Sequence, residues 1–160
     1  MPEDRYRPTL LIVDDEEMVT TSLRNLFRLQ TPYKVVTYTS PEKALAESPQ
    51  NVVDLVITDY LMPVMDGITF LSRFKDLQPH AVRILLTGYA DKENAIKAIN
   101  TVGLYQYIEK PWDNDSLLMI VKNGLEKRQL IRALEVKIAE LDEAHHNLKS
   151  IQTELIKAFM

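Results

Sequence analysis

The chain has 160 residues, 46% of them apolar and 26% charged, so its composition is that of a globular protein with enough apolar material for a core. The absence of cysteine excludes disulfides, thiolate metal sites and a cysteine nucleophile, and the net charge of −4 disfavours a nucleic-acid-binding surface. No apolar run approaches the ~20 residues that span a bilayer, and the first residues, MPEDRYRP, lack the apolar core of a secretion signal, so we expect a cytoplasmic protein.

Five short segments have the composition of β-strands, and they alternate with segments of helical periodicity. The predicted strands cover residues 9–13, 34–38, 53–58, 82–87 and 105–109. The first, third and fourth are almost continuously apolar, which is typical of strands buried on both faces of a parallel sheet.

Helical periodicity is found in each of the segments between these strands. The predicted helices cover residues 16–29, 41–47, 67–77 and 91–102, and a last helix begins at a cap formed by Asn114 or Asp115. In the fourth helix Ala95, Ile99 and Val102 recur on one face, which we expect to be the buried one. The strict alternation of five strands with five helices predicts an α/β fold, with a parallel sheet and helices on both faces.

Polar side chains stand where four of the predicted strands end. Asp14 and Asp15 directly follow the first strand, Asp59 stands at the end of the third, and Thr87 and Lys110 stand at the ends of the fourth and fifth. In a parallel α/β sheet these ends meet at one edge, where ligands bind. A single aspartate there is as readily a turn residue or a helix cap. Three carboxylates, a hydroxyl and an ammonium together indicate a site.

The residue types at this edge favour phosphate chemistry. Three carboxylates at close range raise one another's pKa or require a cation. Oxygen ligands without a nearby histidine suit Mg²⁺, which binds through carboxylates, water and a substrate phosphate. A carboxylate beside Mg²⁺ and a lysine is able to attack phosphorus and form an acyl phosphate, while Lys110 and the Thr87 hydroxyl stabilise the phosphoryl oxygens.

Four segments together resemble the receiver domain of bacterial two-component response regulators. They are residues 10–17 (LLIVDDEE), 59–67 (DYLMPVMDG), 87–88 (TG) and 107–111 (YIEKP). The resemblance covers roughly residues 8–126, in the family's order of motifs. It implies a flavodoxin-like, doubly wound sheet of five parallel strands in the order 2-1-3-4-5.

The resemblance also implies a role for each acidic residue of the site. Asp59 would be the phosphoacceptor and a ligand of Mg²⁺. Asp15 would bind the ion directly and Asp14 largely through water. The backbone carbonyl of Leu61, two residues after the acceptor, would be a further ligand of the ion.

Three further residues take their roles from the same resemblance. Lys110 would pair with the phosphoryl group, and Thr87 and Tyr107 would form a switch pair, in which Tyr107 swings inward when Thr87 moves toward the phosphate. The peptide bond between Lys110 and Pro111 would be cis. Without the family, the sequence favours an ordinary core or edge aromatic on a strand for Tyr107.

The last part of the chain, residues 127–160, follows a receiver domain of residues 1–126 and carries a heptad pattern. Its a positions are Ile131, Ile138, His145, Gln152 and Phe159, and its d positions are Leu134, Leu141, Leu148 and Leu155. Isoleucine at a with leucine at d favours a parallel two-stranded coiled coil, so we expect a homodimer through this C-terminal helix. The alternatives are a single amphipathic helix that folds back on the receiver, or a connector to a further output domain.

The expected function is that of a response regulator in a two-component phosphorelay. A sensor histidine kinase would donate a phosphoryl group to Asp59, and the switch would control an output through the C-terminal helix. The chain itself would show only weak self-phosphorylation and autodephosphorylation, with no direct nucleic-acid or membrane partner. The runs 87–91 (TGYAD) and 110–112 (KPW) are similar to receivers linked to HD-type cyclic-di-GMP phosphodiesterases or to hydrogenase-type regulators, so the output domain could itself be an enzyme.

Two other classes of protein are alternatives to this reading. An aspartyl-nucleophile phosphatase of the haloacid-dehalogenase type would place D-x-D-x-T after its first strand, whereas this chain has Asp14-Asp15-Glu16 there. A phosphate-independent dimerisation scaffold would have no need of the acceptor, lysine and threonine positions.

Overall fold

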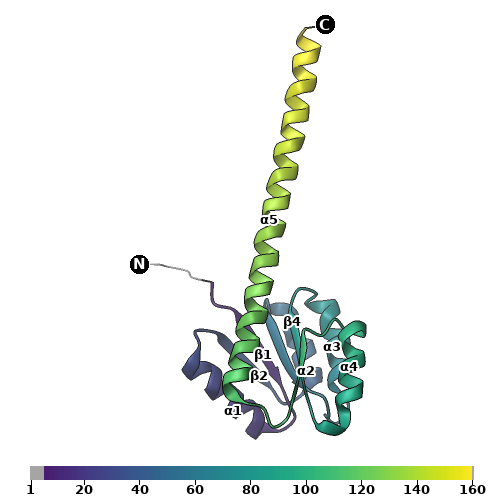
Figure 1. Ribbon diagram of the computed structural model, residues 1–160. Coiled ribbons are helices and arrows are strands. Elements are labelled where there is room, and N and C mark those ends of the chain that lie inside the picture. The colour runs from purple at the N-terminus through teal and green to yellow at the C-terminus, as the bar shows by residue number, and fades with distance from the viewer. Residues whose placement is uncertain (1–5, 160) are drawn as a thin grey trace. The chain divides into compact units, whose positions relative to one another are not determined.

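A five-stranded parallel sheet forms the centre of the computed structural model, which describes residues 6–159 (Figure 1). Residues 1–5 and 160, at the outer ends of the two predicted regions, lie outside this description. The strand order is β2-β1-β3-β4-β5, and every neighbouring pair is parallel. The strands are β1 (Thr9–Val13), β2 (Lys34–Tyr38), β3 (Leu55–Asp59), β4 (Val82–Thr87) and β5 (Gln106–Glu109). The predicted doubly wound, flavodoxin-like fold is confirmed.

Helices connect the strands and follow the last one. They are α1 (Glu17–Gln30), α2 (Pro41–Glu47), α3 (Gly67–Leu77), α4 (Lys92–Thr101) and α5 (Asn114–Ala158), with short 3₁₀ turns η1 (Ser48–Gln50) and η2 (Tyr89–Asp91). The chain divides between Leu125 and Glu126 into two compact units. Among the helices of residues 6–159, none combines the length and the apolarity that a membrane crossing requires.

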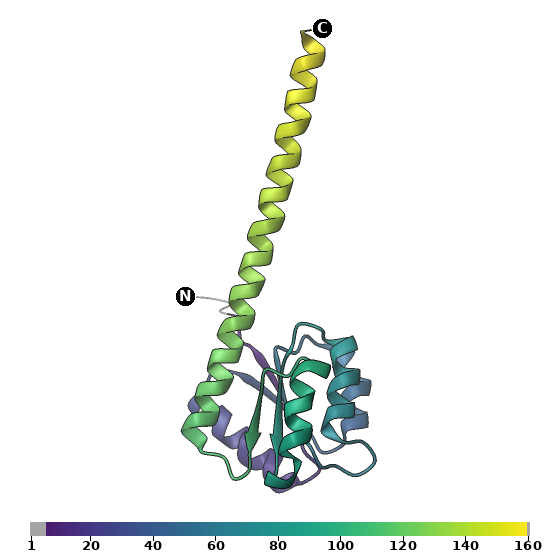
Figure 2. The same ribbon diagram turned by 45° about the vertical axis from the view of Figure 1, so that its right-hand side comes forward.

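The sheet is buried by helices on both faces (Figures 1 and 2). Phe27 of α1 and Leu117 and Val121 of α5 pack with Ile12 and Ile57 on one face. The helices α2, α3 and α4 cover the other face, where an equally apolar cluster forms. The nearly complete burial of β1, β3 and β4 agrees with their continuous apolar runs. The polar residues Asp14, Asp59 and Thr87 lie where these apolar runs end, and they are buried as well.

The fourth predicted helix buries a different residue from the one expected. Ala95, Ala98 and Val102 are buried, whereas Ile99 is 40% exposed. Positions 98 and 99 both fit a helical stripe that contains 95 and 102, so periodicity alone does not choose between them. The small side chain of Ala98 faces the sheet, and Ile99, one residue on, turns toward solvent.

The boundaries of two other elements also differ from the prediction. The cap of α5 is Asp113, whose carboxylate accepts hydrogen bonds from the Ser116 amide at 2.9 Å and the Ser116 hydroxyl at 3.0 Å. Asn114, one of the two predicted caps, instead accepts a hydrogen bond from the Trp112 indole at 3.1 Å. The strand β3 begins two residues later than predicted, because the Val53 amide donates to the Gln78 side chain.

Gly67, the first residue of α3, lies against the end of β3. A Cβ atom there would collide with the backbone carbonyl of Asp59 and lie 2.9 Å from Cδ1 of Leu85. Its own amide donates to the carbonyl of Tyr60 at 2.8 Å. Only glycine therefore allows the loop after β3 to close this tightly around Asp59.

We predict that Gly67→Ala lowers the free energy of unfolding by about 1–3 kcal/mol, because the added methyl group pushes the loop away from the strand. Urea unfolding followed by circular dichroism measures the loss. The matched control is Gly88→Ala, where a Cβ atom would meet only the Asp91 carboxylate, at 3.8 Å. Equal effects of the two substitutions would contradict the prediction.

Candidate functional site

Three carboxylates meet at the ends of β1 and β3. Val13 of β1 lies beside Thr58 of β3 in the parallel register, so the residues that follow them, Asp14 and Asp59, are neighbours at the same edge. One oxygen from each of Asp14, Asp15 and Asp59 lies within 4.8 Å of the others. Asp14 and Asp59 are buried, and Asp15 is exposed. The edge thus holds two carboxylates in the protein interior and one at its surface.

Lys110 is the cation that joins the two buried carboxylates. Its Nζ lies 2.9 Å from Oδ1 of Asp59 and 3.5 Å from Oδ2 of Asp14. Its backbone amide donates to the carbonyl of Thr87 at 2.9 Å, so the end of β4 positions the lysine at the end of β5. The peptide bond between Lys110 and Pro111 is cis, as the family resemblance implied.

Backbone amides also donate hydrogen bonds to the two buried carboxylates. The amide of Glu16 donates to Oδ1 of Asp14, and the amide of Tyr60 donates to Oδ1 of Asp59, each at 2.9 Å. The sequence analysis missed both contacts, because any residue type supplies a backbone amide. The only sequence feature that could have predicted them is position, because each amide lies one or two residues beyond an aspartate at the end of a strand.

The ionisation of the site shows how burial and charge compete. Burial raises the pKa of Asp14 to about 6, although the hydrogen bond from Glu16 acts to lower it. Burial likewise raises the pKa of Asp59, against the opposing effect of Lys110. Burial acts to lower the pKa of Lys110, but its hydrogen bond to Asp59 and the charge of Asp14 outweigh this and raise it. The positive charge of Lys110 therefore does not fully offset the effect of burial on the two carboxylates.

The geometry of the cluster fits a small divalent cation. Oδ2 of Asp14 is buried and accepts no hydrogen bond from the described residues. The Lys110 ammonium lies 3.5 Å from this oxygen, and a proton or a divalent cation would satisfy it more fully. Asp15 and Asp59 supply carboxylate oxygens close by, an all-oxygen donor set of the kind that suits Mg²⁺. Leu61 follows Asp59 by two residues, and because a leucine side chain has no ligand atom, only its backbone carbonyl could bind an ion.

Thr87 and Tyr107 lie on the same face of the sheet but in different environments. Thr87 is fully buried at the end of β4, and its hydroxyl donates to the carbonyl of Gly88 at 2.7 Å. Tyr107, in β5, lies beside Leu85 of β4. It is half-buried against the apolar cluster under α3 and α4. Because side chains alternate along a strand, Thr87 points to the face of Leu85, two residues earlier.

Comparison with known proteins identifies the family of this chain. The family model of the response regulator receiver domain matches residues 10–122. The chain is 36% identical over 122 residues to the hydrogenase transcriptional regulatory protein HoxA of Cupriavidus necator, a match that covers 76% of this chain and 25% of that protein. HoxA of Bradyrhizobium diazoefficiens is 31% identical over 143 residues, covering 89% of this chain and 29% of that protein. This chain therefore spans about a quarter of the length of these curated relatives.

A solved structure agrees with the sequence matches. The signal receiver domain of an HD domain-containing protein from Pseudomonas fluorescens Pf-5 superimposes with a TM-score of 0.73 at 37% identity, and the match covers 78% of this chain and 98% of that one. Hydrogenase regulators and HD-domain receivers, the two groups indicated by the sequence resemblance, are both among the relatives.

We predict that Asp14→Asn stabilises the metal-free chain at pH 7. The pKa of Asp14 is raised from 3.8 to about 6, so the native state binds the proton more tightly than the unfolded state. The contribution of Asp14 to the free energy of unfolding is therefore greatest below pH ~4. It decreases by about 3 kcal/mol in total as the pH rises to ~6. The asparagine variant should escape this loss.

Urea unfolding in EDTA at pH 4 and pH 7 measures the effect. The variant should be more stable than the wild type at pH 7 and nearly equal to it at pH 4. Asp76→Asn, an exposed carboxylate on α3, is the matched control and should change neither value. A difference of the same size at both pH values would contradict the assignment.

Proposed function

Because the chain belongs to the response regulator receiver family, we propose that Asp59 accepts a phosphoryl group from a sensor histidine kinase in a Mg²⁺-dependent reaction. The observation that carries this proposal is the buried Asp59 carboxylate, 2.9 Å from the Lys110 ammonium and within 4.8 Å of two further carboxylates. Nucleophile, cation and metal ligands are the parts that phosphoryl transfer to a carboxylate requires.

The two oxygens of Asp59 have different surroundings, which bears on the transfer step. Oδ1 accepts from both Lys110 and the Tyr60 amide, so we assign the attack on phosphorus to Oδ2. A bond forms between Oδ2 and phosphorus as the bond from phosphorus to the donor histidine nitrogen breaks. Lys110 stabilises the negative charge of the phosphoryl oxygens.

The proposed Mg²⁺ site is formed by oxygen atoms at the ends of β1 and β3. The carboxylates of Asp14, Asp15 and Asp59 and the backbone carbonyl of Leu61 are the proposed ligands. When bound, Mg²⁺ would neutralise charge on the phosphoryl oxygens. Oδ2 of Asp14 supports this assignment, because it accepts no hydrogen bond from the described residues and has only a long contact of 3.5 Å to the Lys110 ammonium.

Thr87 and Tyr107 are the proposed switch. The Thr87 hydroxyl now donates to the Gly88 carbonyl, and a phosphoryl group on Asp59 would offer it a stronger, charged acceptor. A shift of Thr87 toward that acceptor frees space on the face it shares with Tyr107. The half-buried Tyr107 then has an inward position to occupy. The phosphoryl group biases the equilibrium between these two arrangements.

The unit formed by residues 126–160 is the proposed route to dimerisation and output. Its apolar a and d side chains from Ile131 to Leu155 are 45–68% exposed in the single chain. A parallel coiled coil of two chains would bury this stripe. Since the names of the curated relatives describe transcriptional regulators, the output of a longer protein would be a second domain that this helix connects to the receiver.

Intact mass spectrometry tests the phosphoacceptor. After incubation with a small-molecule phosphodonor and Mg²⁺, the wild-type chain should gain one phosphoryl group, and the gain should vanish in EDTA. Asp59→Asn should gain none, because an amide is not a nucleophile toward phosphorus. Asp76→Asn, on the exposed side of α3, should behave as the wild type. A phosphoryl group retained on folded Asp59→Asn would overturn the proposal.

Sedimentation equilibrium tests the dimer. Ile138→Asp places two carboxylates in the proposed seam and should weaken the dimer by about tenfold or more. Val136→Asp is the matched control, because Val136 is an equally exposed aliphatic residue at a heptad position outside the seam. Monomeric wild-type chain at micromolar concentrations, or equal effects of the two variants, would contradict the coiled coil.

A further inference from the structure

The first part of β2 is left uncovered on one face of the sheet. The helix α2 has seven residues, so it is about 10 Å long, whereas the five residues of β2 span about 16 Å. After α2 the chain continues into η1, whose Ser48 lines the space beside β2. As a result Val36, in the middle of β2, is 40% exposed, whereas its neighbour Leu11 in β1 is buried.

A cavity of about 570 Å³ begins at this uncovered area and extends around the edge strand to its other face, where Tyr33 and Val35 line it; it is called here the β2 cavity. Leu11, Val36 and Val53 form an apolar part of its lining, and the buried Ser48 borders it from η1. Tyr38 also borders it, and a hydrogen bond from its hydroxyl to the Glu47 carboxylate raises the pKa of the phenol. The cavity thus combines an apolar surface with a few polar groups, as ligand sites do.

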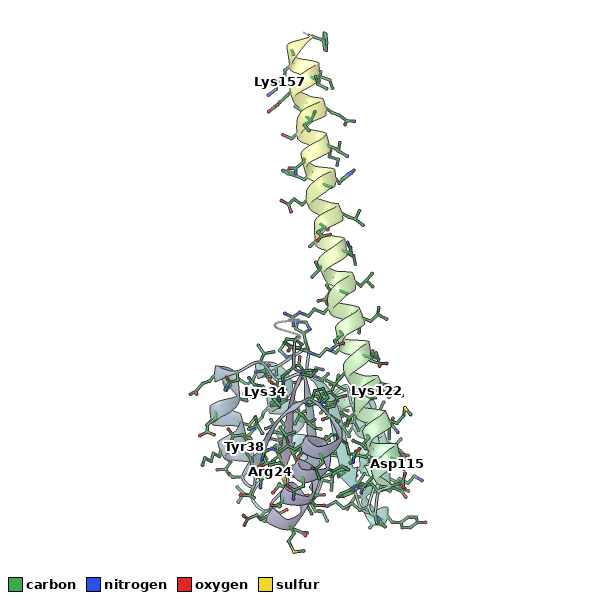
Figure 3. All side chains as sticks on the ribbon, turned by 90° about the vertical axis from the view of Figure 1, so that its left-hand side faces the viewer. Arg24, Lys34, Tyr38, Asp115, Lys122 and Lys157 are labelled. Atoms are coloured by element: carbon green, nitrogen blue, oxygen red, sulfur yellow. The ribbon has the colours of Figure 1, made fainter. Side chains whose placement is uncertain are left out.

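The charges around the β2 cavity are mostly positive. Arg7, Arg28 and Lys34 line it, with Glu47 as the opposing carboxylate, although the whole chain has a net charge of −4. Arg7 is held in place by a 2.8 Å hydrogen bond from its Nε to the carbonyl of Pro32. Figure 3 labels Lys34 and Tyr38, the first and last residues of β2.

We propose that the β2 cavity binds a small organic anion with an apolar body. The volume lies within the range of about 300–1,000 Å³ that small-molecule sites occupy. The apolar lining would bury the body of the ligand, and the cationic side chains would bind its carboxylate, sulfonate or phosphate group. None of the described residues that line the cavity belongs to the acidic site, so this proposal stands apart from phosphorylation.

Two dyes that differ in one charged group test the proposal on the full chain. The anionic probe is 8-anilinonaphthalene-1-sulfonate, and the neutral probe is N-phenyl-1-naphthylamine, which lacks the sulfonate. Fluorescence titration gives the two dissociation constants, and amide chemical-shift mapping by NMR locates each dye. We expect the anionic dye to bind more tightly and to shift the amides of Val36, Tyr38 and Ser48.

Variants separate the contribution of charge from that of shape. Lys34→Met keeps the aliphatic stem and removes the charge, so the anionic dye should bind about fivefold more weakly while the neutral dye is unaffected. Val36→Glu should exclude both dyes, and its exposed position makes it compatible with folding, which circular dichroism checks. Lys75→Met on α3 is the matched control.

Three results would overturn the proposal. One is equal affinity of the wild-type chain for the two dyes. Another is a set of shifted amides confined to the exposed apolar stripe of residues 131–155, which would show that the dyes bind the helix instead. The third is an anionic-dye affinity that Lys34→Met and Lys75→Met leave equally unchanged.

Discussion

A single ammonium group, that of Lys110, stands between two carboxylates that the fold buries. The parallel pairing of β1 and β3 brings Asp14 and Asp59 together, and β5 carries the lysine to them through the hydrogen bond between its amide and Thr87. Without a cation, the two carboxylates would repel each other in a region that solvates neither. The close packing of Gly67 against the Asp59 carbonyl closes the loop after β3 beside this group of charges.

The charge of Lys110 only partly compensates the buried carboxylates. The negative charge that remains accounts for the chemistry that the site supports. The pKa of Asp14 stays raised despite Lys110, and Oδ2 of Asp14 accepts no hydrogen bond from the described residues. A divalent cation would neutralise the negative charge that Lys110 leaves uncompensated at this carboxylate. Burial of an ionised Asp14 opposes folding at neutral pH, and such a cost at a proposed functional site is common in proteins.

Much of this arrangement could be predicted from sequence, because buried parallel strands need continuous apolar runs and a polar residue that ends such a run marks the edge of the core. Asp59 could be placed for that reason. The buried face of α4 could not be predicted, because Ala98 and Ile99 fit the same periodicity. Only the distance at which the helix packs on the sheet decides between them. The amides of Glu16 and Tyr60 have no side-chain signal. The β2 cavity depends on where α2 stops relative to β2, which no local pattern encodes.

The dependence of the site on Lys110 can be measured with a double-mutant cycle. Lys110→Met, Asp59→Asn and the double variant are unfolded with urea at pH 7 in EDTA, and their free energies are compared with the wild type. If Lys110 compensates the buried Asp59 carboxylate, Lys110→Met should destabilise the wild type more than it destabilises Asp59→Asn, with a coupling of about 1–3 kcal/mol. Effects that simply add would show that the ion pair does not hold this edge of the sheet together.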